Sequence, residues 1–136
     1  MAPLYSGPKL TLRILSEPFA ICRLSPSAPI PDWFTPSPLS SITYTDNELS
    51  IIAPTNTMPS GPDTEIGWRA LSVIGSLDFS LVGILASLIG PLAEASISIL
   101  TVSTYDTDYI LVRETQLSAA IDALGNLVQW PNDRTG

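Results

Sequence analysis

The chain has 136 residues, of which 13 are acidic and 6 are basic, so its formal net charge is −7. It contains no histidine and a single cysteine, which excludes histidine-based catalytic triads, histidine metal sites and a disulfide within these residues. The negative charge argues against nucleic acid and anionic membranes as partners, because both present a negative surface.

The first half of the chain is predicted to be rich in strands. Apolar and polar residues alternate over residues 10–15, and a second apolar run covers residues 19–24, so each run is predicted to be a strand. Cys22 lies in the second run and is expected to be half-buried. A proline-rich stretch follows, with at most a short helix near Asp32. Two further strands are predicted at residues 41–45 and 49–53.

Residues 57–67 are rich in proline, glycine and polar residues, which predicts a linker between two halves. The second half is predicted to follow the order β-α-β-β-α. On its first helix Leu81, Ile84, Leu88 and Leu92 recur at helical spacing, so this stripe is predicted to face a core. The predicted elements are a strand at 68–74, a helix at 77–95, strands at 97–103 and 108–113, and a helix at 115–127.

Residues 81–100 are apolar and long enough to span a bilayer, and Glu94 carries their only formal charge. Gly90 and Pro91 interrupt this run, and no cluster of basic residues flanks it. The sequence therefore favours a helix followed by a strand over a transmembrane segment. The sum of the elements predicts an α+β fold, in which helices cover one face of antiparallel sheets.

Two segments carry a resemblance to a known family. GWRALSVIGSLDFSLVGILASLIGPLAEASISIL at residues 67–100 and STYDTDYILVRE at residues 103–114 resemble the signature of small two-module ACT-domain proteins, of the CASTOR-like and aspartate-kinase types. The strings FAICRL, PIPDWF and ELSII resemble the degenerate first module of such proteins. The resemblance covers residues 10–127 and implies tandem ferredoxin-like modules with β-α-β-β-α-β topology.

The resemblance also implies a binding site for a small ligand, usually an amino acid, at the seam between the modules. The domains expected from it are a degenerate module at 1–56, the linker at 57–67, an ACT module at 68–130 and a tail at 131–136. Ser96 stands where relatives typically have glycine after the helix. A left-handed residue other than glycine costs about 1 kcal/mol, so a relaxed or shifted helix end is expected there.

The start of the first helix is a candidate anion site, because the first N–H groups of a helix have no intrahelical partners and the helix dipole favours negative charge. These N–H groups are expected around Ser80 to Gly83, and Gly83 would let a ligand approach the backbone closely. Asp78 could accept a ligand ammonium. The ligand-binding residues predicted on this segment are Asp78, Phe79, Ser80, Leu81, Val82 and Gly83.

The turn between the last two strands is the second candidate segment. Asp106 or Asp108 could accept an ammonium group there, and Tyr105 could form a wall of the site. A site that offers helix N–H groups to a carboxylate and aspartate side chains to an ammonium group suits a zwitterionic ligand. The ligand-binding residues predicted on this segment are Ser103, Thr104, Tyr105, Asp106, Thr107 and Asp108.

A structural role stays open for each carboxylate. Asp78 is also a good helix N-cap, and Asp106 is a common turn residue. Strand alternation puts Asp108 on the same face as Ile110 and Val112, where it would need a partner such as Arg69 or Arg113.

The leading hypothesis is a noncatalytic, sensory or regulatory protein that binds an amino acid, is cytoplasmic and forms a homodimer. An alternative is a small enzyme that uses Asp78, Asp106 or Asp108 as base and Tyr105 or Tyr109 as acid. A third is a pure assembly module. No glycine-rich phosphate motif occurs, so no nucleotide cofactor is expected, and no metal is expected either.

Overall fold

A computed structural model of the chain describes residues 9–74 and 83–131. The chain divides into two compact units. We call residues 17–68 the strand unit, and the residues before 17 and after 68 the helical unit. The domain boundaries expected from the sequence stay a prediction, although strand β4 already begins at Thr64, within the expected linker.

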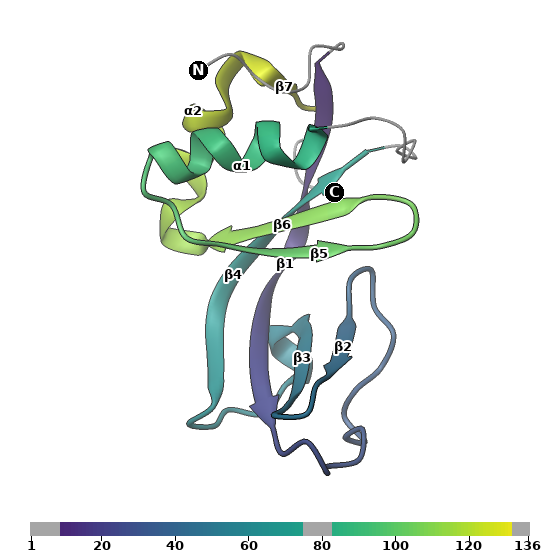
Figure 1. The fold of residues 1–136 in the computed structure, drawn as a ribbon. Helices are drawn as coiled ribbons and strands as arrows, with labels where there is room; N and C mark the ends of the chain where they lie inside the picture. The colour runs from purple at the N-terminus through teal and green to yellow at the C-terminus, as the bar shows by residue number, and fades with distance from the viewer. Residues whose placement is uncertain (1–8, 75–82, 132–136) are drawn as a thin grey trace. The chain divides into compact units, whose positions relative to one another are not determined.

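The strand unit is built on antiparallel pairing. It contains the second part of β1 (Leu10–Leu24), β2 (Ser41–Tyr44), β3 (Leu49–Pro54), the 3₁₀ turn η1 (Thr55–Thr57) and the first part of β4 (Thr64–Val73). β3 lies between β2 and β1, and both pairs are antiparallel (Figure 1). The residues buried in its core are Ala20, Cys22, Leu49, Ile51, Ala53 and Met58.

Strand β1 corrects one prediction from the sequence. Two strands, at residues 10–15 and 19–24, were expected, whereas a single strand of 15 residues is observed. Ser16, Glu17 and Pro18 are exposed, so the chain passes through them in extended conformation without needing an apolar partner. Near Asp32, where at most a short helix was predicted, the chain forms a turn.

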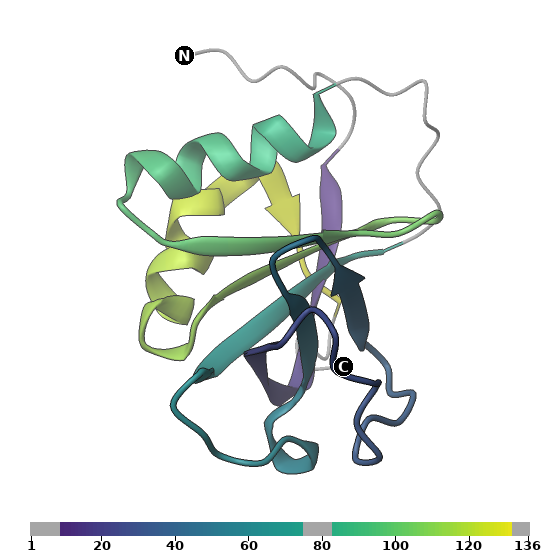
Figure 2. The ribbon, with the colours of Figure 1, turned by 60° about the horizontal axis from the view of Figure 1, so that its bottom comes forward.

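The helical unit has the predicted β-α-β-β-α order. Its elements after β4 are α1 (Ile84–Glu94), β5 (Ile99–Ser103), β6 (Asp108–Arg113), the 3₁₀ turn η2 (Glu114–Gln116), α2 (Leu117–Leu124), the 3₁₀ turn η3 (Gly125–Leu127) and β7 (Val128–Gln129). The strand order is β1, β4, β6, β5, and β7 pairs in parallel with the start of β1. Both helices lie on the same side of β5 and β6 (Figures 1 and 2). The predicted α+β class is confirmed.

A core between the helices and the strands holds the helical unit together. Leu88 and Leu92 of α1 are fully buried in it, as the helical spacing predicts. Leu10, Leu12 and Ile14 enter it from alternate positions of β1. The other buried members of this core are Leu71, Val73, Ile84, Ile97, Ile110, Val112, Ala120, Leu124 and Val128.

The helix bounds differ from those predicted. α1 begins at Ile84, after Gly83 at its N-cap, and the earlier start predicted at residue 77 lies outside the described residues. α2 is shorter than predicted, because its ends tighten into the turns η2 and η3. Within the described ranges no helix is long and apolar enough to cross a membrane.

The end of α1 corrects the expectation for Ser96. This residue has φ 60°, so it does adopt the left-handed conformation. The N–H of Ser96 donates to the carbonyl of Ala93 at 3.0 Å, and that of Ile97 donates to the carbonyl of Leu92 at 3.0 Å. Ile97 is buried in the core, and this contact fixes the chain direction after the helix. The packing of Ile97 therefore overrides the backbone preference of serine.

Ser96→Gly is expected to raise the free energy of unfolding by roughly 0.5–1 kcal/mol, because glycine adopts the left-handed conformation without steric cost. Urea denaturation measures this change. The control is Ser98→Gly at a nearby exposed residue without a positive φ, which is expected to lower the same quantity by roughly 0.5 kcal/mol. Equal losses in both variants would contradict this account of the helix end.

Candidate functional site

The turn between β5 and β6 is closed by its own hydrogen bonds. The N–H of Thr104 donates to the carbonyl of Thr107 at 2.8 Å. The Thr104 hydroxyl donates to the same carbonyl at 3.1 Å and accepts from the N–H of Thr107 at 3.2 Å. The predicted polar turn is thus present, and its threonines fix the positions of Tyr105 and Asp106 between them.

A further hydrogen bond attaches this turn to β4. Oγ1 of Thr107 donates to the carbonyl oxygen of Val73 at 2.8 Å. Val73 is the last residue of β4, and from there the chain leads through residues 75–82 to α1. The turn therefore lies beside the end of the strand that precedes the other candidate segment, residues 78–83. Asp78, Phe79, Ser80, Leu81 and Val82 lie outside the described residues.

Within the candidate segment at residues 78–83, Gly83 is the residue that the structure describes. It has φ 86° and is the N-cap of α1, and its carbonyl accepts the N–H of Ser87 at 2.8 Å. Because a helix bonds each N–H to the fourth residue before it, the first N–H groups of α1, from Ile84 onward, lack such partners. These groups begin after Gly83, whereas the sequence placed them around Ser80 to Gly83. The first turn of α1 contains no acidic residue.

Asp108 is half-buried at the start of β6 and has a side-chain partner. Oγ of Ser103, directly opposite on β5, donates to its Oδ1 at 2.6 Å. Such a hydrogen bond to a carboxylate is short and strong. The pairing with Arg69 that the sequence left open is not formed, because Arg69 donates to the carbonyl of Leu15 at 3.1 Å and lies 3.9 Å from Glu114.

Tyr105, Asp106 and Tyr109, the other acid or base candidates near the turn, differ in how far they are exposed to solvent. Tyr105 is 83% exposed, and Asp106 is exposed as well. Strand alternation places Asp108 on the face of β6 that carries the core residues Ile110 and Val112, with the half-buried Tyr109 on the opposite face. Asp108 and Tyr109 are thus not brought together as an acid and base pair.

Two cavities in the strand unit were not predicted from the sequence. The larger has a volume of about 320 Å³ and the smaller about 220 Å³. Both are lined in part by Cys22, Arg23, Pro62 and Asp63. The exposed Arg23 beside Cys22 in a predicted strand was the available signal, but it does not indicate which segments lie beside that strand. No cluster of metal-binding side chains occurs in residues 9–74 and 83–131.

Cys22 is more buried than expected, at 5% exposure. Burial raises the pKa of its thiol above the ordinary value, and a hydrogen bond with the backbone of Ile51 acts in the opposite direction. The thiol is therefore poorly suited to act as a nucleophile, because the reactive species is the thiolate.

Thr107→Val is expected to lower the free energy of unfolding by about 1 kcal/mol, because it removes the donor and leaves the carbonyl of Val73 without this partner. Urea denaturation measures the loss. The control is Thr101→Val on β5, where the side chain is exposed and makes no hydrogen bond within the described residues. If the two variants are equally stable, the Thr107 hydrogen bond does not hold the turn to β4.

Alkylation of Cys22 by iodoacetamide at pH 8 is expected to be at least about tenfold slower in the folded protein than in urea, because the raised pKa and burial reduce the accessible thiolate. The folded state holds the thiol proton more tightly than the unfolded state. The resulting stability is therefore fully present below the unfolded pKa and is lost as pH rises through the folded pKa. Cys22→Ala should lack this pH-dependent component, and equal alkylation rates in both states would contradict the burial of the thiol.

Comparisons with known proteins agree with this fold. A family model described as an ACT domain matches residues 63–126, and a model of an N-terminal domain matches residues 17–61. The cytosolic arginine sensor for mTORC1 subunit 1 of Rattus norvegicus is 54% identical over 43 residues, which are 32% of this chain and 13% of that protein. This similarity thus spans only about an eighth of the curated relative.

Two solved structures cover nearly the whole chain. A crystal structure of a protein from Agrobacterium tumefaciens has a TM-score of 0.84 and 34% identity, over 96% of this chain and 99% of that one. The regulatory subunit of aspartate kinase from Thermus thermophilus has a TM-score of 0.57 and 10% identity, over 92% of this chain and 99% of that one, and shares the fold alone. With the matched ACT-domain model, the similarity to the Agrobacterium tumefaciens protein shows that the chain belongs to the ACT-domain family.

Proposed function

We propose that this chain binds a free amino acid in its helical unit and acts as a noncatalytic regulatory protein. The observation that carries the proposal is the hydrogen bond from Thr107 to Val73, which holds the turn bearing Asp106 beside the end of β4. The ACT-domain family supports the class of function. So do the names of two similar proteins, an arginine sensor and an aspartate kinase regulatory subunit.

The proposed ligand contacts follow from charge. The N–H groups at the start of α1 bind the carboxylate of the amino acid, because they lack intrahelical partners and lie at the positive end of the helix dipole. Asp108 binds the ammonium group, and Asp106 assists from the turn. Asp78, Phe79, Ser80, Leu81 and Val82 stay in the proposal as contacts from the segment before α1.

Ser103 has a supporting role in this proposal. A carboxylate in a half-buried position loses favourable contacts with water, and the hydrogen bond from Ser103 offsets part of that cost. Asp108 has a second oxygen and further lone pairs, which can accept a hydrogen bond from a ligand. The Ser103 hydroxyl thus orients the carboxylate without using all of its capacity to accept.

The proposal also includes a homodimer and a cytosolic location. β5 forms an edge of the strand order in the helical unit and carries half-buried Ile99, Leu100 and Val102, which could pair with a second copy. The location rests on the similarity to the cytosolic arginine sensor.

Calorimetric titration with a panel of the free amino acids is expected to show saturable binding of at least one of them. Asp108→Asn should weaken that binding about tenfold, because it removes the charge that binds the ammonium group while an amide oxygen remains to accept from Ser103.

The matched control is Asp122→Asn, which makes the same charge change on the exposed side of α2. It should bind like the parent protein. An absence of binding across the panel by a folded protein, or equal affinity in the Asp108 variant, would contradict the proposal.

A further inference from the structure

The connection between β1 and β2, residues 25–40, carries three hydroxyl residues that directly precede a proline (Figure 1). They are Ser25 before Pro26, Thr35 before Pro36 and Ser37 before Pro38, and no other serine or threonine of the chain precedes a proline. Proline-directed protein kinases recognise such a pair, because they bind the proline, which lacks a backbone N–H, beside the reacting hydroxyl. The connection therefore offers three candidate acceptors of a phosphate.

The hydroxyl groups of Ser25 and Ser37 are held by hydrogen bonds. Ser25 begins a turn in which its carbonyl accepts the N–H of Ala28 at 3.0 Å. Its Oγ accepts the N–H of Ser27 at 3.3 Å and lies 3.0 Å from Oγ of Ser27. Ser37 is half-buried, and its Oγ donates to the carbonyl of Leu39 at 2.7 Å. Each serine must give up hydrogen bonds before its hydroxyl can react.

Thr35 differs from both serines. Thr35 and Pro36 are exposed, and the Thr35 hydroxyl makes no hydrogen bond within the described residues. Residues 35–38 belong to no helix or strand, and no backbone hydrogen bond involves them in the part of the chain that the structure describes. A residue before proline is restricted to extended conformations, which is the form in which a kinase cleft binds its substrate. Thr35 therefore meets the needs of a kinase without local unfolding.

Two aromatic residues anchor the connection directly before Thr35. Trp33 and Phe34 are partly buried and pack against the core of the strand unit. The N–H of Phe34 donates to the carbonyl of Pro31 at 3.1 Å, which closes a turn. These contacts hold the chain on the core up to Phe34, and the exposed Thr35 and Pro36 follow at the surface.

We propose that Thr35 is a phosphorylation site for a proline-directed protein kinase. In the transfer, Oγ1 of Thr35 attacks the γ-phosphorus of Mg²⁺-bound ATP, and the bond between that phosphorus and the β–γ bridging oxygen breaks. ADP leaves, and the hydroxyl proton passes to the catalytic aspartate of the kinase. The site lies in the strand unit and does not depend on the amino-acid site proposed for the helical unit.

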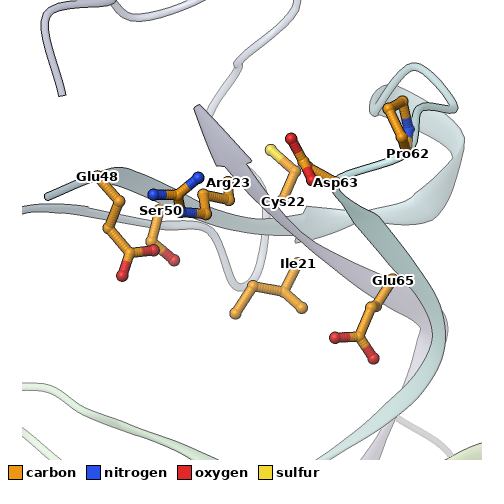
Figure 3. Close-up of a pocket in the computed structure, with 8 residues that line it drawn as sticks. All are labelled: Ile21, Cys22, Arg23, Glu48, Ser50, Pro62, Asp63 and Glu65. Carbon is orange, nitrogen blue, oxygen red and sulfur yellow. The ribbon is translucent and has the colours of Figure 1, made fainter. Parts of the chain in front are cut away.

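The strand unit offers little that would bind the added phosphate. A phosphothreonine carries a charge of about −1.5 to −2 at pH 7. Arg23 is the only basic residue among residues 17–68, and it lines the larger cavity together with Glu48 and Asp63 (Figure 3). Its Nη2 already donates to the carbonyl of Asn47 at 3.3 Å. The modification therefore adds negative charge to this unit, which has no basic cluster that would order the connection around the phosphate.

The test incubates the full chain with a purified mitogen-activated protein kinase and Mg²⁺-ATP, and tandem mass spectrometry follows each site over time. The initial rate at Thr35 is expected to exceed those at Ser25 and Ser37 at least about fivefold, because only the serines must first give up a hydrogen bond. Thr35→Ser keeps the hydroxyl and should be phosphorylated at this position, whereas Thr35→Val should not.

A pair of proline variants tests whether the kinase reads the residue after Thr35. Pro36→Ala keeps the Thr35 hydroxyl but removes the recognised proline, so the rate at Thr35 should fall at least about tenfold. The matched control is Pro29→Ala, at an exposed proline of the same connection that follows an alanine. It should leave the rate at Thr35 unchanged, and the amide NMR spectrum shows whether each variant is folded.

Several results would overturn the proposal. They are an absence of phosphate on Thr35 of the folded chain, a rate at Ser25 or Ser37 equal to that at Thr35, and a parent-like rate at Thr35 in folded Pro36→Ala. An equal loss of rate in the Pro29 and Pro36 variants would also overturn it, because the residue after Thr35 would then have no special role.

Discussion

The helical unit depends on the packing of the first strand of the chain against elements that come much later. Leu10, Leu12 and Ile14 enter the same core as Leu88 and Leu92 of α1. This contact places β1 beside β4, and β4 in turn lies beside β6. The elements from β4 to α2 follow the β-α-β-β-α order, and the short β7 comes after them. A ferredoxin-like sheet needs a further strand beside β4, and the start of β1 supplies it.

The same arrangement determines where polar groups collect in the helical unit. A strand that ends at Val73 leaves its last carbonyl available, and the Thr107 hydroxyl donates to it. The hydrogen bonds between Thr104 and Thr107 therefore close the turn between β5 and β6, and the bond from Thr107 to Val73 attaches the turn to β4. A carboxylate such as Asp108 that is oriented before a ligand arrives loses less conformational entropy on binding.

The local sequence pattern was sufficient to predict those elements whose structure is determined by residues close together in the chain. β6 has the predicted bounds, since the apolar run from Tyr109 to Val112 is bounded by the charged residues Asp108 and Arg113 and a polar turn precedes it. The stripe of Leu88 and Leu92 identified the buried face of α1. The threonines of the turn between β5 and β6 could likewise be assigned to the candidate site from their position between two predicted strands, although their hydrogen bonds to Val73 and to each other could not.

The remaining features depend on residues distant in sequence. Ser96 takes a left-handed conformation because Ile97 packs into the core, and the identity of serine gives no sign of that. The cavity around Arg23 requires β3 on one side and residues 62–65 on the other, which no local pattern predicts. The two apolar runs at residues 10–15 and 19–24 suggested two strands where one strand continues, because the exposed residues 16–18 between them need no partner in the core.

Hydrogen exchange of the full chain with and without a saturating mixture of amino acids tests the central claim most directly. Binding in the helical unit predicts slower exchange at residues 103–108 and at the first residues of α1, with unchanged exchange at α2, which lies outside the proposed contacts. Unchanged exchange at residues 103–108 and at the start of α1 would contradict the claim that this unit binds an amino acid.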